Sequence, residues 1–91
     1  MYKKRTTIKN KTGLHARPAS EFIAMASKFS SRITIKKLSE DEDANAKSIV
    51  MLLALGLAMG EEVEIVAKGD DEVEAVDSLI ALIDSKFGEE E

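Results

Sequence analysis

The sequence predicts an α+β fold in which helices cover one face of a β-sheet. Segments that alternate apolar and polar residues are interleaved with segments whose apolar residues recur at helical spacing. The alternating segments bury only one of their two sides, as expected for a sheet with helices on one face. At 91 residues the chain is long enough for one compact core. We therefore expect a single domain over residues 1–91.

The first predicted elements are a strand and a helix. Residues 2–9 are rich in Thr and Ile, which favours a strand, and Gly13 breaks that pattern. A helix is predicted from Arg17, with Pro18 in the first turn, where its missing N–H and fixed φ are tolerated. The apolar positions of this helix lie on one face: Ala19, Phe22, Ile23, Ala26 and Phe29.

The middle of the chain predicts a second strand, a turn and an unusually apolar helix. Residues 32–38 alternate, residues 39–43 form a turn, and a short partner strand follows at 44–45. Residues 48–59 are almost continuously apolar and rich in Leu, Met and Ala, which favours a helix, with Gly60 as its C-cap. Such a helix is either buried on most sides or presents part of its surface for docking.

The last third of the chain predicts a strand followed by a helix. Residues 62–68 alternate cleanly, and a turn at Gly69 separates them from the next element. Asp70 or Asp71 is a suitable N-cap for a helix whose apolar residues recur from position 73 to 87. Gly88 ends that helix.

Composition excludes several classes of function. The net charge is −4, which argues against nucleic acid as the main partner. No apolar stretch is long enough to span a membrane, and no secretory signal follows the basic N-terminus. The chain has no Cys, which excludes disulfides and thiolate zinc sites and agrees with a reducing cytosol. Acidic runs at 40–43 and 88–91 are expected to be a solvated loop and tail.

The segment GLHARPA at residues 13–19 contains the only histidine of the chain. His15 lies at or near the N-cap of the first helix, where unpaired N–H groups and the helix dipole favour an anion. Arg17 adds a planar fork of donors that suits phosphate oxygens. The pattern indicates a histidine that carries a phosphoryl group or binds an anion beside it, or else an ordinary surface residue at a helix start.

Two other chemistries fit the histidine poorly. A metal site needs further ligands, and none stand at ligand spacing near His15. A serine hydrolase is disfavoured because the chain has no Gly-x-Ser-x-Gly motif. Ser48, in NAKSI, is interpreted first as an N-cap, although a phosphate there is also physically reasonable.

Several motifs, taken in order, resemble the HPr family of histidine-containing phosphocarriers. They are GLHARPA with Asn10 upstream, ASKF at 26–29, NAKSI at 45–49, LG at 55–56, and a final helix ending in SKFGEE. The resemblance extends from residue 5 to residue 88. It implies an open-faced β-sandwich with four antiparallel strands and three helices on one face.

The resemblance also implies roles for individual residues. His15 matches the histidine that takes a phosphoryl group on Nδ1 from enzyme I, itself charged by phosphoenolpyruvate, and passes it to the IIA domain of a sugar permease. Arg17 matches the arginine that assists transfer, and Ala16 the residue whose backbone N–H lies close to the phosphate. Such a protein is a carrier rather than an enzyme and uses no cofactor or metal.

Regulation and docking are implied in the same way. Ser48 matches the serine that HPr kinase/phosphorylase modifies in many members. Five positions match residues that contact partners: Ser20, Ala24, Ile49, Val50 and Leu53. The family role implies a cytoplasmic protein, and we expect a monomer that neither enters membranes nor binds nucleic acid.

Some features depart from the HPr pattern. Met51 stands where Gly is usual in the kinase-regulated members, and the turn at 38–44 is longer and more acidic. Both features resemble NPr, the phosphocarrier of the nitrogen-related phosphotransferase system, whereas Lys47 and Ser48 resemble kinase-regulated HPr. Two further alternatives are a signalling protein switched at Ser48 and a module that only binds partners, which the intact His15 and Arg17 disfavour.

Overall fold

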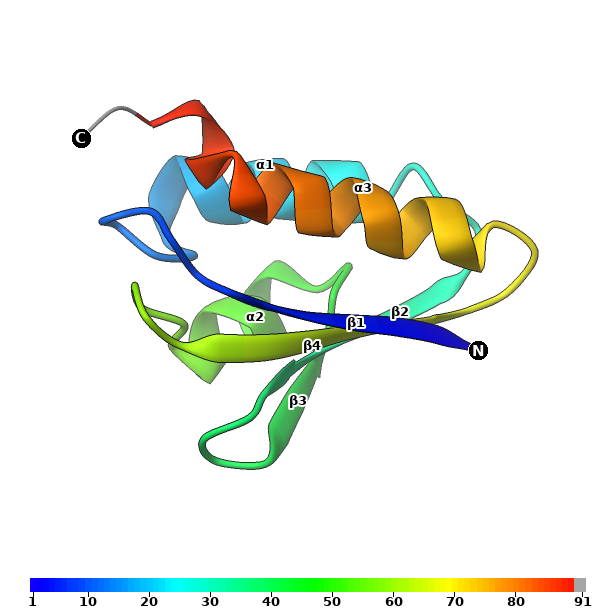
Figure 1. Cartoon of the computed structure of the whole chain (residues 1–91), viewed down its shortest axis with the longest axis horizontal. Helices are drawn as coiled ribbons and strands as arrows, with labels where there is room; N and C mark the ends of the chain where they lie inside the picture. The colour runs from blue at the N-terminus through cyan, green and yellow to red at the C-terminus, as the bar shows by residue number, and fades with distance from the viewer. Residues whose placement is uncertain (90–91) are drawn as a thin grey trace.

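The computed structural model describes residues 1–89, and within them a four-stranded sheet carries helices on one face (Figure 1). The elements in chain order are β1 (Tyr2–Thr7), α1 (Ala16–Ala26), β2 (Arg32–Lys37), β3 (Glu42–Asn45), α2 (Ile49–Leu55), β4 (Glu62–Lys68), α3 (Glu72–Asp84) and a short 3-10 helix, η1 (Lys86–Gly88). This architecture confirms the predicted α+β class and the open-faced sandwich. No helix among the described residues is sufficiently long and apolar to cross a membrane.

The strands lie in the order β1-β4-β2-β3, and every neighbouring pair is antiparallel. The first and second strands therefore do not pair with each other, because β4 inserts between them. In β2 and β4 the alternation predicted from sequence is present: Ile33, Ile35, Val63 and Ile65 are buried toward the helices. The residues between them face the open side of the sheet.

One row of side chains crosses the open face with alternating charge. Arg5 of β1 is paired in register with Glu64 of β4, which is paired with Lys36 of β2, which is paired with Asp43 of β3. Opposite charges on directly facing positions stabilise neighbouring strands. The Arg5 Nε–Glu64 Oε2 distance is 3.0 Å, so at least one pair of the row is a formed ion pair.

The core lies between the sheet and the helices. Its largest fully buried side chains come from every layer: Ile8, Leu14, Phe22, Ile33, Ile35, Leu52, Leu57, Val63, Ile65, Val76, Leu79 and Ile83. The apolar face predicted for the first helix is confirmed at Ala19, Phe22 and Ala26, which are buried. Ile23 and Phe29 pack against the core while keeping some exposure.

The predicted end of the apolar helix was wrong. The helix α2 has only seven residues and ends at Leu55, because Gly56 takes the left-handed conformation (φ 67°) and is its C-cap. The chain then leaves the helix and buries Leu57 in the core. Gly60, which we expected to cap the helix, lies instead in the turn before β4.

The last helix also ends earlier than predicted, at Asp84, and Phe87 is buried from η1 rather than from α3. Asp71 occupies the predicted N-cap position, but its side chain makes no capping hydrogen bond. Its carboxylate instead accepts bonds from the backbone N–H groups of Ser30 (2.9 Å) and Ser31 (3.0 Å). The acidic tail predicted at 88–91 falls partly outside the described residues.

Candidate functional site

The loop that precedes α1 is clamped against the segment between α2 and β4. The Leu14 N–H donates to the Leu57 carbonyl (2.9 Å), and Leu14 itself is fully buried. Gly13 has a φ of 68°, and a Cβ built on it would lie 2.4 Å from the Leu57 oxygen. Two more backbone bonds join the same segments: Ile8 N–H to the Glu61 carbonyl (2.9 Å) and Gly60 N–H to the Ile8 carbonyl (2.8 Å).

A buried asparagine holds the turn of this loop together. The Asn10 side chain has no exposed surface, and its Nδ2 donates to the Gly13 carbonyl (2.9 Å) and to Thr12 Oγ1 (3.0 Å). The Gly13 N–H donates back to the Asn10 carbonyl (3.2 Å). These bonds fix the backbone two residues before His15. Sequence reasoning includes Asn10 only as part of a motif and misses this positioning role.

His15 stands at the N-cap of α1, as predicted, with extended backbone angles (φ −131°, ψ 160°). Its imidazole is exposed and makes no capping bond, and the first turn contains no acidic residue. The first N–H groups of the helix therefore have neither an intrahelical acceptor nor a first-turn carboxylate beside them. Ala16 has a left-handed φ of 52°, a conformation that costs an alanine energy and sharpens the turn at the histidine.

Arg17 does not stand free beside His15. Its guanidinium forms an ion pair with Glu21, one helical turn further on, and both of its terminal nitrogens donate to the Phe87 carbonyl at 3.4 Å. The predicted cation is thus in the first turn, but it is held by an internal carboxylate. The i,i+4 spacing of Arg17 and Glu21 is a signal that could have revealed this pair.

Ser48 is the N-cap of α2, as its simplest interpretation predicted, and its Oγ accepts a hydrogen bond from the Met51 N–H (3.3 Å). The helix exposes much of its apolar surface: Ile49, Val50, Met51 and Leu53 are all exposed, and Val50 keeps 75% of its surface. The α2 helix therefore fits the second sequence-based alternative, a helix with an exposed apolar side.

The remaining predicted contact residues lie on the first helix. Ser20 and Ala24 are exposed and stand one turn apart on α1, which packs against α2. The described part of the chain contains no cluster of three or more His, Asp or Glu side chains that could hold a metal ion. The site thus consists of one exposed imidazole, an open helix N-terminus and a nearby guanidinium. That set suits a nucleophile that receives an anionic group.

Comparison with known proteins identifies the family to which a chain with this site belongs. The model of the phosphotransferase-system HPr component phosphorylation site matches residues 2–85. The chain is 41% identical over 86 residues to the HPr-like protein Crh of Halalkalibacterium halodurans, covering 94% of this chain and all of that protein. It is 39% identical to the phosphocarrier protein NPr of Proteus mirabilis, covering 96% of each.

Solved structures give the same result. An HPr structure from Thermoanaerobacter tengcongensis superposes with a TM-score of 0.96 at 52% identity, covering both chains completely. A dimer of HPr from the same organism gives a TM-score of 0.77 at 54% identity, covering 92% of this chain and 94% of that one. The chain belongs to the HPr family of phosphocarriers of the phosphotransferase system, proteins that carry a phosphoryl group and are not enzymes.

Proposed function

We propose that this chain carries a phosphoryl group on His15, receiving it from phosphorylated enzyme I and passing it to a IIA component. The observation that carries the proposal is the exposed imidazole of His15 at the N-terminus of α1, whose first turn carries no acidic residue. The neutral imidazole with its proton on Nε2 presents a lone pair on Nδ1. As that lone pair forms the new P–N bond, the bond between phosphorus and enzyme I breaks.

The other site residues stabilise the charge of the transferred group. In the transition state negative charge is spread over the three equatorial phosphoryl oxygens, which need nearby donors. The Ala16 N–H and the Arg17 guanidinium are the donors we assign. Because Arg17 is paired with Glu21 and the Phe87 carbonyl, it must exchange these contacts for the phosphoryl oxygens during transfer.

The direct test is incubation of the chain with phosphoenolpyruvate and enzyme I. We expect one phosphate per chain, labile in acid and stable in base, and its complete loss in a His15→Ala variant that retains the wild-type unfolding curve. Since the chain has no second histidine, any label retained by that variant would lie on another residue type and would overturn the assignment.

The exposed side of α2 is the surface we propose for docking, together with Ser20 and Ala24. Ile49, Val50 and Leu53 give it an apolar centre, as is usual for an interface core. Replacing Val50 by Asp is expected to raise KM for enzyme I while leaving the unfolding free energy within about 0.5 kcal/mol, because the side chain is exposed. An unchanged KM would exclude Val50 from the interface.

Ser48 offers a regulatory switch beside this docking surface. A phosphate on it would place about two negative charges next to the apolar residues that meet enzyme I. The matched pair Ser48→Asp and Ser48→Asn tests the charge, because both residues cap helices well and differ mainly in charge. We expect slower transfer from enzyme I in the Asp variant alone. Equal rates in the two variants would remove the basis for regulation by HPr kinase/phosphorylase.

A sugar-system HPr is the first candidate for the particular role, and an NPr-type regulatory carrier is the second. The NPr alternative is favoured by the similarity to Proteus mirabilis NPr and by the acidic turn between β2 and β3. Exposed Met51 adds to it. Phosphorylation by the enzyme I of the sugar system and by that of the nitrogen system, compared at equal concentrations, distinguishes them: the faster donor identifies the pathway.

The proposed role places the protein in the cytoplasm, where phosphoenolpyruvate is formed. We expect the monomer to be the working form, because His15 and the α2 surface both belong to a single chain. Because one similar HPr structure is a dimer, the oligomeric state of this chain should be measured. Light scattering at micromolar concentration should give the mass of one chain, and a stable dimer mass would contradict the expectation.

A further inference from the structure

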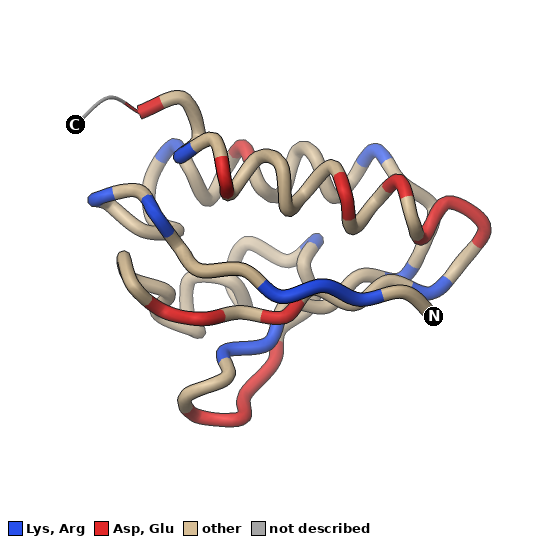
Figure 2. Tube along the Cα trace, viewed as in Figure 1, with Lys and Arg blue, Asp and Glu red and all other residues tan. Residues whose placement is uncertain are grey.

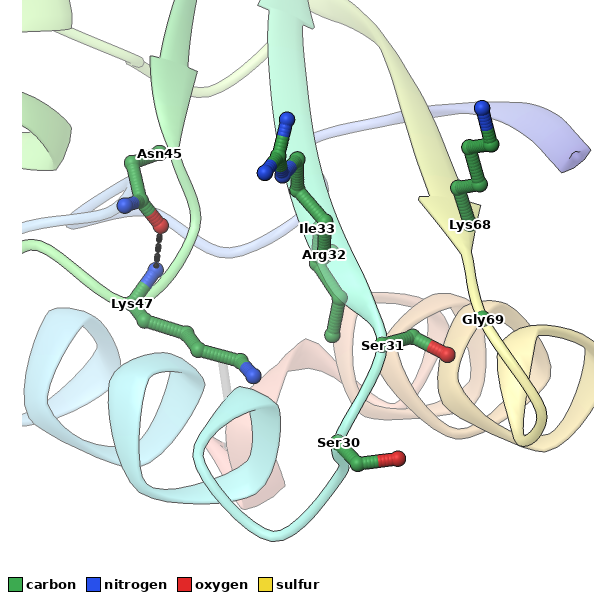
Figure 3. Close-up of a pocket in the computed structure, with 8 residues that line it drawn as sticks. All are labelled: Ser30, Ser31, Arg32, Ile33, Asn45, Lys47, Lys68 and Gly69. Atoms are coloured by element: carbon green, nitrogen blue, oxygen red, sulfur yellow. Dashed lines mark hydrogen bonds between the residues drawn. The ribbon is translucent and has the colours of Figure 1, made fainter.

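A basic hollow lies at the end of the sheet where β2 begins and β4 ends (Figure 3). Its volume is about 650 Å³, and Arg32, Asn45, Lys47 and Lys68 contribute to its walls. In Figure 3 the side chains of Arg32 and Lys68 extend from neighbouring strands toward the same side, and Lys47 lies on the other side of Arg32. Nothing in the carrier role uses these residues.

Arg32 and Lys68 break the charge pattern of the sheet. They are directly paired in register, so two cations face each other on adjacent strands. Like charges in this arrangement are destabilising. Both side chains are exposed, and neither forms an ion pair within residues 1–89. The row that crosses the face at Glu64, by contrast, alternates in sign.

Two of the three carboxylates in the turn after Lys68 are engaged elsewhere, and the third, Asp70, is exposed. Glu72 follows Lys68 across the turn, but its two oxygens accept from the N-terminal ammonium (3.0 Å) and from the Gly69 N–H (3.1 Å). The Asp71 carboxylate accepts hydrogen bonds from Ser31 and Ser30, and these bonds lower its pKa to about 2. It therefore stays ionised, with both oxygens occupied by these bonds. Within the described residues, neither strand cation of the hollow thus forms an ion pair, although the charge of Lys68 contributes to lowering the pKa of Glu72.

The donors on the opposite rim are held in place. The Lys47 Nζ donates to the Phe29 carbonyl (2.7 Å), which leaves two of its three N–H bonds for another acceptor. The Asn45 Oδ1 accepts from the Lys47 backbone N–H (2.9 Å; dashed in Figure 3), which leaves the amide NH₂ group as a donor. Guanidinium, ammonium and amide donors therefore all occur among the residues that line the hollow.

We propose that this hollow binds a phosphate monoester dianion, with Arg32 and Lys68 on its oxygens and Asn45 and Lys47 at its rim. A guanidinium fork suits two oxygens of one phosphate. The ligand must be small, because the acidic turn between β4 and α3 (residues 70–72) follows Lys68 closely (Figure 2) and the chain as a whole carries a net charge of −4. A long polyanion would need a continuous basic stripe.

The hollow is separate from the phosphoryl-accepting site. His15 precedes the first residue of α1, whereas Ser30 and Arg32 follow its last turn. Eleven helical residues span about 16 Å. A phosphate ester bound here would therefore leave His15 accessible, and failure of this proposal would not touch the carrier role.

The test is a titration of the 15N-labelled full chain with inorganic phosphate at constant ionic strength, followed by amide chemical shifts. We expect saturable shifts at Ile33, Asn45 and Gly69, with a dissociation constant on the order of 1 mM because the groups are exposed. Chloride at equal ionic strength should not reproduce them. Shifts confined to the residues around His15, or equal shifts with chloride, would overturn the proposal.

Two variants distinguish a localised phosphate site from a general effect of positive surface charge. Arg32→Gln should weaken phosphate binding about 10-fold through loss of the bidentate contact. Lys11→Gln, which removes one exposed charge from the loop before His15, should change binding less than about twofold. Without phosphate, Arg32→Gln should be as stable as wild type or more stable, since it relieves the repulsion with Lys68. A given concentration of phosphate should raise its melting temperature less than that of the wild type. Equal weakening by both substitutions would contradict a localised site.

Discussion

Replacing Gly13 by alanine tests whether the histidine loop, residues 8–15 before α1, depends on close packing against the segment that follows α2. The residue has φ 68°, which costs an alanine about 1 kcal/mol. Its new Cβ would also lie 2.4 Å from the Leu57 oxygen and 2.9 Å from the Ala58 Cα. Both are backbone atoms, so the two segments must separate for the methyl group to fit.

The magnitude follows from what that separation disrupts. Overpacking of this kind typically costs about 1–3 kcal/mol, and weakening the hydrogen bond from Leu14 to Leu57 adds about 1 kcal/mol. We expect Gly13→Ala to lose about 4 kcal/mol of unfolding free energy, the sum of these costs and the backbone term. Gly56→Ala is the matched control: its φ is 67°, but an added Cβ would meet nothing within 4 Å, so only about 1 kcal/mol should be lost.

Urea unfolding followed by circular dichroism measures both variants. The Gly13 variant should also accept phosphate from enzyme I more slowly, since its loop sets the position of His15, whereas the Gly56 variant should transfer normally. If the two alanine variants lost the same free energy, the close approach to Leu57 would carry no energetic weight. In that case the left-handed conformation alone would explain the glycine.

Three further outcomes follow from individual side-chain contacts. The bonds that the Asp71 carboxylate accepts from Ser31 lower the pKa of Asp71 to about 2, so the stability that they supply is lost as the pH falls from about 4 to 2. Over that range the unfolding free energy should decline more steeply in the wild type than in an Asp71→Asn variant. Lys37→Met should lower the urea midpoint, because the buried ammonium that donates to the last carbonyls of α2 is removed; an unchanged midpoint would refute that role. Glu21→Gln should speed phosphate acceptance about twofold by releasing Arg17, and high salt should abolish the difference, since an exposed i,i+4 pair is worth about 0.5 kcal/mol.

The strands and the faces of the helices could be predicted because local periodicity reports burial directly. The alternation of β2 and β4 and the apolar face of α1 required no knowledge of tertiary contacts. The end of α2 could not be predicted in this way. Leu57 is apolar and buried, so the hydrophobic pattern continues past Gly56, although the backbone has already left the helix.

The polar contacts that the sequence did not indicate have a different cause. Asp71 is in the right place to cap α3, but Ser30 and Ser31, about 40 positions earlier, compete successfully for its carboxylate. Arg17 is predicted as a donor to phosphate oxygens beside His15, and the sequence does not indicate that its partners in this structure include the Phe87 carbonyl 70 positions away. When several polar atoms lie near a side chain, the tertiary geometry determines which of them becomes its hydrogen-bond partner, and residue spacing does not encode that geometry.

The backbone bonds that join residues 8–14 to residues 57–61 determine how the histidine loop moves. Ile8, Leu14 and Gly60 donate across this junction, and Ile8 and Leu14 are buried on either side of it. Surface loops usually exchange their amide hydrogens through small local openings. Here the Leu14 amide cannot exchange unless the core opens, so its protection should approach that of β4. The proposed phosphoryl acceptor, His15, is then an exposed side chain on a backbone that we expect to open only with the core.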